Sequence, residues 1–296
     1  MIYAGEIAAI GTAICWAITS TSFEDAGKRI GSFNLNLIRL LFGFLFLTTY
    51  NFFSRGYLLP MDASSDAWLW LLLSGIVGIV LGDLLLFEAF VRIGARISML
   101  IYASVPPLSG IIAYIFLGDS MTFLEILGMM IVLFGIAMVI LDGGKKGEKI
   151  KFSHPVIGIL LAFGGALGQS AGYIIGKYGL GDYDPFAATQ IRLIAGIISF
   201  TLLFTLKGQW PSFIQVLKSP KQLKSTVIGS FFGPFLGISL SLFAVQRINP
   251  GVASTLISIT PILLIPYVVI VKKEKVALKE VIGSIVAVIG LAILFI

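Results

Sequence analysis

The feature that most constrains this chain is an internal repeat. From Gly78 onward the sequence matches itself at an offset of 155 residues, so that Pro106 corresponds to Pro261 without a gap. Nearer the N-terminus an offset of 153 residues relates Arg39 to Arg192. The same two offsets also relate Gly11, Phe33, Gly43, Gly82, Glu125, Gly128 and Gly135 to Gly164, Phe186, Gly196, Gly237, Glu280, Gly283 and Gly290. A repeat of this length predicts two copies of one structural unit.

The composition places both copies in a membrane. The chain is 57% hydrophobic and only 12% charged, with a mean hydropathy of +1.01, whereas soluble domains carry about twice that share of charge. Apolar stretches of roughly 20 residues recur, each long enough to cross a bilayer as a helix. We predict an all-α protein of the cell (inner) membrane with ten transmembrane helices, at 3–22, 34–53, 67–91, 95–117, 123–141, 155–177, 185–206, 226–246, 251–271 and 279–296.

Five helices per half is an odd number, so the second half enters the membrane from the opposite face and the repeats are inverted. The expected boundaries are 1–141 for the first repeat, 142–154 for a hydrophilic linker and 155–296 for the second repeat. Inverted repeats in an apolar chain are typical of secondary transporters, whose substrate site lies between the halves near the bilayer midplane.

The basic residues predict an orientation. Loops after odd-numbered predicted helices hold 16 Lys and Arg, the opposite face holds three, and two lie within helices. The positive-inside rule places the Lys-rich loops in the cytoplasm and both termini outside. Because the net charge of +6 comes from short loops beside apolar helices, the expected partner is the lipid bilayer with its anionic headgroups and not a nucleic acid.

Signatures of catalysis are missing. One histidine, His154, leaves no H-E-x-x-H zinc motif, and one cysteine, Cys15, leaves no intrachain disulfide. The segment from Gly172 to Lys177 is one residue short of a phosphate-binding loop and lies in an apolar stretch. We expect neither an enzyme nor a bound cofactor or metal, and without an ATP site any transport is driven by a gradient.

Polar residues at helical spacing form the first group of candidate substrate-binding residues. Polar side chains that face lipid cost several kcal/mol, so these stripes are expected to face the interior, although residues near a helix end can instead reach the membrane surface. The stripes are Gln169, Tyr173 and Lys177 and, 153 residues earlier, Trp16, Ser20 and Glu24. Beside them, Gly164, Gly168, Gly172 and Gly176 form a smooth face for close helix packing.

Prolines supply the second group. Pro106, Pro107 and Pro261 interrupt two predicted helices, and the carbonyls that each proline frees are tolerable only if they are buried or face a watery cavity. We assign Pro106 and Pro261 to gating. The neighbouring Tyr102, Ser254 and Ser258 are candidate substrate ligands, with the alternative that Ser and Thr bond back to their own helix.

Ionisable residues within the helices form the third group. Asp83 and Glu88 have the apolar repeat partners Ile238 and Phe243, and a deep carboxylate is a functional candidate by default. Asp83 is the stronger candidate for coupling transport to protons, and the alternative is a protonated or arginine-paired structural Asp. Arg39 and Arg192 occur in both halves, which favours a role in the fold or in gating, or else contact with headgroups. Arg39 is a candidate counter-ion of Asp83.

The order of these features resembles the drug/metabolite transporter superfamily, in particular the EamA-type permeases. The resemblance rests on a glycine-studded helix, a helix with Pro106 or Pro261, an acidic residue at Asp119 or Glu274, and a final helix with Gly128 and Gly135 or Gly283 and Gly290. It covers essentially the whole chain. It implies a ten-helix exporter or exchanger of small metabolites such as amino acids, with a central cavity that opens alternately to either side.

Two departures from the family pattern matter. The loop from Ser54 to Asp66 holds a single basic residue, Arg55, where relatives commonly have a basic loop and cytoplasmic termini, so family habit and charge bias disagree on orientation. Lysine is frequent in the family at the position of Glu24, but here only Lys177 retains it, which affects the expected charge of the substrate.

The expected function is secondary transport of a small metabolite. The alternatives are a channel or facilitator, or a non-transporting membrane scaffold, although a scaffold has little use for deep carboxylates. We expect helices one, three, four, six, eight and nine to line the cavity. Helices five and ten are expected at the periphery, where they would provide the contact if the protein is a homodimer and not a monomer.

Overall fold

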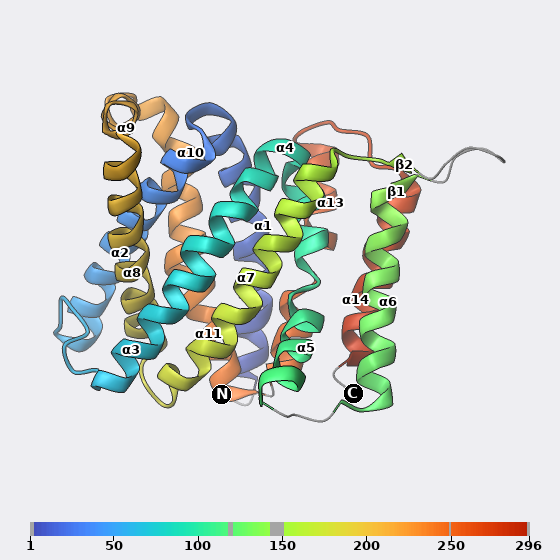
Figure 1. Cartoon of the computed structure of the whole chain (residues 1–296), viewed down its shortest axis with the longest axis horizontal. Coiled ribbons are helices and arrows are strands. Elements are labelled where there is room, and N and C mark those ends of the chain that lie inside the picture. The colour runs from blue at the N-terminus through green and yellow to red at the C-terminus, as the bar shows by residue number, and fades with distance from the viewer. Residues whose placement is uncertain (1–2, 118–120, 143–150, 249, 295–296) are drawn as a thin grey trace.

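The chain folds into a bundle of long helices (Figure 1). The computed structural model describes residues 3–117, 121–142, 151–248 and 250–294. Within these residues, seven helices are long and apolar enough to cross a membrane, and two shorter apolar helices accompany them. In lipid every backbone polar group needs an internal partner, which helices supply. The prediction of an all-helical, multi-pass membrane protein is confirmed.

The first half begins with two long helices, and the glycine-rich segment that follows them is π-helical. Its elements are α1 (Ala4–Ile30), α2 (Ser32–Arg55), α3 (Ser65–Ser74), the π-helix η1 (Gly75–Gly82), α4 (Asp83–Tyr102), α5 (Val105–Leu117) and α6 (Phe123–Ile140). Gly94 has a φ of +81° and breaks α4 into two helices, because only glycine takes this conformation at no steric cost.

A short antiparallel pair, β1 (Leu141–Asp142) with β2 (Lys151–Phe152), joins the last residue of the predicted first repeat to the predicted linker, 142–154. The second half then repeats the first with one addition, α9. Its elements are α7 (Val156–Leu180), α8 (Pro185–Lys207), α9 (Trp210–Leu217), α10 (Pro220–Ser230), the π-helix η2 (Phe231–Gly237), α11 (Ile238–Arg247), α12 (Pro250–Ile257), α13 (Thr260–Ile270) and α14 (Leu278–Leu294).

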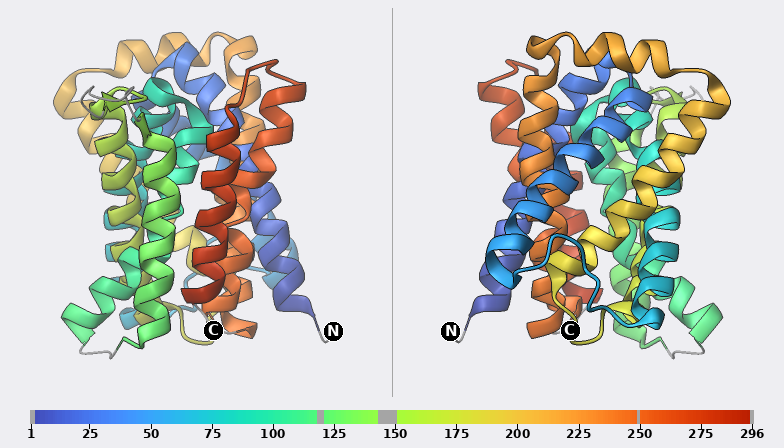
Figure 2. Two further views of the ribbon diagram at one scale, coloured as in Figure 1. Left: turned by 90° about the vertical axis from the view of Figure 1, so that its right-hand side faces the viewer. Right: turned by 90° about the vertical axis from the view of Figure 1, so that its left-hand side faces the viewer.

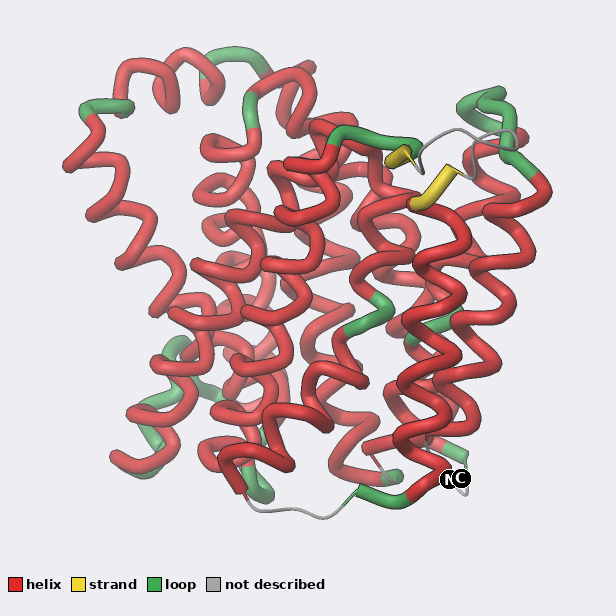
Figure 3. Tube along the Cα trace, turned by 45° about the vertical axis from the view of Figure 1, so that its right-hand side comes forward, coloured by secondary structure: helices red, strands yellow, loops and turns green. Residues whose placement is uncertain are grey.

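The sequence repeat is visible in the breaks between helices. Residues 103–104 separate α4 from α5, and residues 258–259, 155 positions later, separate α12 from α13. In Figure 3 these interruptions lie at mid-height of the bundle. The π-helices η1 and η2 also correspond at this offset.

The two halves interlock through their first helices. Helix α7 packs against η1 of the first half, and α1 packs against η2 of the second half. A Cβ added at Gly172 would lie 2.7 Å from the Cα of Gly78. At the equivalent contact, a Cβ at Gly233 would lie 2.6 Å from Cγ2 of Thr19. Each glycine therefore allows a helix to approach closely across the boundary between repeats.

Helices α6 and α14 pack against each other at one side of the bundle, as Figure 2 shows. A Cβ added at Gly135 would lie 2.6 Å from the carbonyl oxygen of Gly283, and one at Gly290 would lie 2.9 Å from that of Gly128. The predicted leucine-glycine packing surfaces thus face one another within a single chain. These glycine faces are therefore not free to form a dimer contact.

Helix α9 was missed by the sequence reading, which left its residues in a loop. Pro211 lies in its first turn, Phe213 and Val216 are buried, and Ile214 and Leu217 are exposed. Trp210 donates a hydrogen bond from Nε1 to Oγ1 of Thr205 at 3.1 Å. Helix α9 packs against α10 and α2 with its buried side.

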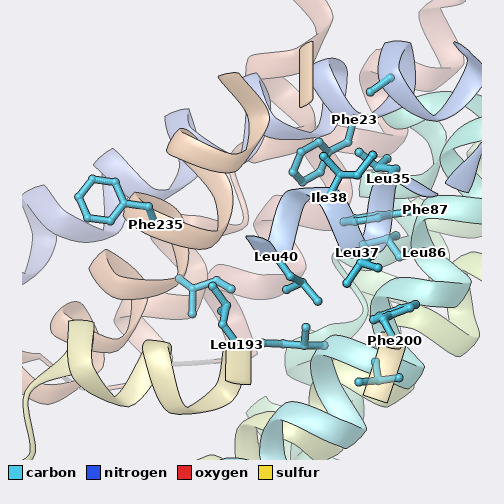
Figure 4. Close-up of a cluster of buried hydrophobic side chains, with 14 of the residues drawn as sticks. Phe23, Leu35, Leu37, Ile38, Leu40, Leu86, Phe87, Leu193, Phe200 and Phe235 are labelled. Carbon is cyan, nitrogen blue, oxygen red and sulfur yellow. The ribbon is translucent and has the colours of Figure 1, made fainter. Parts of the chain in front are cut away.

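The largest core cluster joins α1, α2, α4, α8 and η2 (Figure 4). Phe23 and Phe87 have ring centroids 5.1 Å apart, and Phe87 and Phe90 are stacked at 5.5 Å. Its aromatic part, Phe23, Phe87 and Phe90, packs between α1 and α4, while Leu71, Leu180 and Leu242 of the same cluster belong to the wall of the cavity described below.

Candidate functional site

A cavity of about 1060 Å³ lies between the two halves. Its wall includes Trp16 of α1, Tyr102 of α4, Tyr173 of α7 and Arg192 of α8. It reaches the turn between α7 and α8 at Gly181, on the face where α1 begins and α14 ends (Figure 2). The cavity therefore opens toward the face that carries the termini.

Several predicted residues meet on this wall although they are far apart in the sequence. They come from both halves, as expected for a site at a repeat interface. The predicted residues that line the cavity are Trp16, Tyr102, Pro106, Tyr173, Lys177, Arg192, Ser258 and Pro261.

The helices that line the cavity include all six that were expected, and three others also contribute. Met129 of α6 and Leu294 of α14 lie on the wall, so these two helices are not purely peripheral. Arg192 adds α8.

Side-chain hydroxyls bond to the backbone at both breaks. Ser170 of α7 donates a hydrogen bond from Oγ to the carbonyl of Val105, next to Pro106, at 3.0 Å. Thr260 donates at 2.7 Å to the carbonyl of Ile257, which Pro261 leaves without its helical N–H donor. Irregular backbone at membrane depth occurs where it is buried in protein or lines a cavity, and here it does both.

Three residues predicted to line the cavity lie elsewhere. Ser20 is buried and donates a hydrogen bond to its own helix, at the carbonyl of Ala17. Gln169 is buried in the packing of α7 against η1, because the helix is rotated so that Tyr173 faces the cavity. Glu24 lies at the opposite end of the protein. The side chain of Ser254, also predicted to bind substrate, lies outside the described residues.

Glu24 ties three helices together at the closed end. Its carboxylate accepts hydrogen bonds from Lys272 Nζ at 2.8 Å and from the backbone N–H of Ala95 at 3.0 Å, and it also binds Lys28. Lys272 lies beyond the end of α13. Burial alone would lower the pKa of Lys272, but the hydrogen bond and the charge of Glu24 raise it above its ordinary value. The prediction of a substrate role for Glu24 is replaced by that of a clamp.

Arg39 and Asp83 meet inside the bundle. Arg39 donates from Nη2 to Oδ2 of Asp83 at 2.7 Å, and its guanidinium carbon lies 4.6 Å from the centroid of the Phe87 ring. Both residues are buried and neither lines the cavity. Glu88 is half-buried nearer the surface, where it accepts hydrogen bonds from Ser32 and Arg92.

Arg192 is buried like Arg39 but has no such partner. Its Nε and Nη2 atoms are buried, and neither makes a hydrogen bond within the described part of the chain. The titratable groups that interact with it electrostatically are Tyr173, Asp83 and Tyr102. Its burial at 2% exposure excludes the alternative that it reaches the lipid headgroups.

The open end has its own tie between loops. Tyr183 donates a hydrogen bond from its hydroxyl to Oδ1 of Asp62 at 2.9 Å, and Arg55 forms an ion pair with the same carboxylate. Burial raises the pKa of Tyr183 to about 12. These contacts join the turn between α7 and α8 to the loop after α2.

The sequence reading missed other residues on the wall. Met99, Ser109, Ser241 and Gln246 contribute to it. Ser241 lies in α11, which corresponds in the repeat to the part of α4 that carries Asp83. The repeat could therefore have indicated Ser241 as a candidate. The two methionines, Met99 and Met129, carried no polar signal in an apolar helix.

Comparisons with known proteins agree with this architecture. The model of the EamA-like transporter family matches residues 3–141 and 156–296. No match is found among curated proteins. A solved structure described only as "Crystal structure of protein" has a TM-score of 0.64 and 14% identity, covering 99% of this chain and 96% of its own. That likeness shows the fold alone.

Proposed function

The chain belongs to the EamA-like transporter family, and on that premise we propose that it is a secondary active transporter of a small metabolite. The observation that carries this proposal is the cavity of about 1060 Å³ between the repeats, open to one face and closed to the other. Cavities of roughly this size hold small organic molecules. Export or exchange by alternating access is the mechanism that such a site supports.

For the cavity to open to the opposite face, the contacts at the closed end would have to separate. The aromatic cluster around Phe23 and Phe87 fills the bundle there, and Glu24 clamps α1 to Ala95 and Lys272. The breaks at Gly94, at residues 103–104 and at residues 258–259 are the natural hinges, since a hinge needs only a few residues that absorb the backbone change.

We further propose that the chain crosses the inner membrane ten times, five in each inverted repeat. Ten spans result when α4 is divided at Gly94, the helices are joined across η1, η2 and the breaks at residues 103–104 and 258–259, and the short helix α9 is not counted as a span. By the positive-inside rule the closed, lysine-rich end is cytoplasmic, which makes the described state outward-open. Cysteines placed at Arg29 and Ser54, both exposed, test this: labelling of position 29 by an impermeant reagent from outside the cell would reverse the orientation.

Asp83 remains the candidate for proton coupling, now with Arg39 as its partner. Protonation of Asp83 would release Arg39 and alter the packing between α2 and α4. We expect Asp83→Asn to abolish proton-driven accumulation while leaving substrate exchange largely intact, because exchange needs no net change in protonation. Full pH-dependent transport by the mutant would make Asp83 structural and the protein a facilitator.

The decisive test of transport is counterflow in proteoliposomes. Vesicles loaded with an unlabelled amino acid or organic acid from a mixed panel are diluted into the labelled compound. A transporter gives a transient accumulation of label above equilibrium, whereas a channel or facilitated pore gives only equilibration. No counterflow across the panel, from protein that remains monodisperse, would favour the scaffold.

A further inference from the structure

The repeat supplies two arginines inside the bundle but only one carboxylate to pair with them. Arg39 and Arg192 occupy equivalent positions, and the position equivalent to Asp83 is Ile238. Asp83 accepts a hydrogen bond at Oδ2 from Nη2 of Arg39 at 2.7 Å. The cluster of Arg39, Asp83 and Arg192 therefore carries a net charge of +1, since a guanidinium stays protonated in proteins.

The unpaired charge lies at the cavity. Arg192 is one of the residues on its wall, and its Nε and Nη2 atoms are buried without a hydrogen-bond partner within the described residues. A buried charge without a partner is costly, and inside a membrane such a residue is a functional candidate. An anion in the cavity would offset this charge, because Arg192 belongs to the wall, and a small shift of the wall would bring its covered Nε and Nη2 atoms within reach of the anion's oxygens.

The other charged residues on the described wall lie at the mouth. Lys177 is exposed in the last turn of α7 and Asp182 lies in the turn after it. Glu125 is engaged in the N-terminal cap of α6, where it accepts a hydrogen bond from the backbone N–H of Thr122 at 2.6 Å. Arg192 is thus the deep cation of the described wall.

We propose that Arg192 is the anion-binding residue of the cavity and that the substrate is a small organic monocarboxylate with an apolar body. This rests on the proposed transport function. A single net positive charge is neutralised by one carboxylate, whereas a phosphate dianion would leave excess negative charge in a dry site. The planar guanidinium fits a carboxylate in a bidentate geometry. Trp16, Tyr102 and Tyr173 supply apolar surface for the rest of the molecule.

The test compares matched ligands on the purified full-length protein in lipid nanodiscs. Phenylacetate and 4-methylpentanoate are measured against phenylacetamide and 4-methylpentanamide, which have the same shape without the charge, and against inorganic phosphate. Equilibrium dialysis reports binding without requiring transport. We expect both carboxylates to bind at least about tenfold more tightly than their amides, as for a charge-assisted hydrogen bond.

The variants assign this preference to one residue. Arg192→Gln should reduce the preference for carboxylate over amide to about one, and Arg192→Lys should restore part of it. Arg29→Gln, at an exposed position that is not on the cavity wall, should leave the preference unchanged. Equal binding of carboxylates and amides by the wild type, tighter binding of phosphate, or an unchanged preference in Arg192→Gln would each overturn the proposal. So would equal loss of both ligand types in Arg192→Gln, which would indicate a structural role.

Failure of this proposal is distinguishable from failure of the transport function. Carboxylate binding that depends on Arg192 without counterflow would refute transport and leave the site in place. Counterflow of an uncharged compound that is insensitive to Arg192→Gln would refute the site and leave transport in place.

Discussion

Matching residues in the two halves of this protein lie in contrasting surroundings. Arg39 is paired with Asp83, while Arg192 lines the cavity and its Nε and Nη2 have no hydrogen-bond partner in the described part of the chain. Glu24 clamps the closed end, while Lys177, its counterpart 153 residues later, is exposed at the open mouth. The repeated backbone provides two similar scaffolds, and their side chains differ. Glu24 holds the closed end together, and the absence of an acidic residue at the position equivalent to Asp83 leaves the charge of Arg192 available at the cavity.

The close helix contacts show the same contrast in packing. Where α7 meets η1, glycine faces glycine and the nearest atoms are backbone; where α1 meets η2, glycine faces the side chain of Thr19. The first contact is formed by backbone atoms, which a mutation cannot remove. The second contact is formed by the Thr19 methyl group, which a mutation to alanine removes. The pseudo-equivalent interfaces should therefore respond differently to the same mutation.

The largest difference is expected between the two arginines. Arg39→Gln removes the hydrogen-bonded counter-ion of the buried Asp83, which should destabilise the protein by about 3–5 kcal/mol. Arg192→Gln removes a buried charge whose Nε and Nη2 have no hydrogen-bond partner within the described residues, so this variant should be at least as stable as the wild type. Thermal unfolding in detergent measures both, and Asp83→Asn in the Arg39→Gln background should recover most of the loss. Equal losses in the two single variants would contradict the assigned asymmetry.

The second comparison concerns the glycine contacts. Gly172→Ala places a Cβ 2.7 Å from the Cα of Gly78, and because backbone cannot yield, we expect a cost of about 3 kcal/mol. Gly233→Ala meets Cγ2 of Thr19 at 2.6 Å and should cost less.

A compensating mutation separates the two contacts. Thr19→Ala removes Cγ2 and leaves Cβ at 3.5 Å from the new methyl, so the double variant with Gly233→Ala should regain nearly all the lost stability. No side chain can be trimmed to rescue Gly172→Ala. The prediction is wrong if Thr19→Ala gives no recovery in unfolding temperature.

The third comparison concerns the two ends. Glu24→Gln removes the charge that holds Lys272 and Lys28 and should weaken the closed end by about 2 kcal/mol, the range of hydrogen bonds to charged groups. Lys177→Gln, at the open end, should have little effect. A cysteine at the buried Ser20, in a Cys15→Ala background, should be labelled faster in Glu24→Gln. Equal labelling rates in both variants would refute the clamp.

The smallest expected effect is the pH dependence of this clamp. Because Glu24 raises the pKa of Lys272 above its ordinary 10.5, the stabilisation is fully present below that pH and is lost as the pH rises through the raised value. The difference in unfolding temperature between wild type and Lys272→Met should thus be constant from pH 7 to about pH 10 and shrink above it. A difference that shrinks already near pH 8 would contradict the ion pair.

The sequence by itself determined the repeat, the hydrophobic spans and the breaks near Pro106 and Pro261. These are local properties: the length of an apolar segment, the missing N–H of proline and the self-match of the chain. It also singled out Asp83 as the residue that breaks the symmetry, because Ile238 stands at the matching position.

Only the tertiary structure decided which faces meet. Lipid and protein interior are both apolar, so hydrophobicity does not distinguish a helix face that packs from one that contacts lipid. Gln169 and Tyr173 are consecutive members of one stripe, yet only Tyr173 lines the cavity. Likewise, a glycine face in the sequence permits close packing but does not show which helix packs against it. The structure shows that α6 packs against α14. Asp83 pairs with Arg39 and not with Arg192 because of the distances between helices. The spacing of residues along a single helix does not specify those distances.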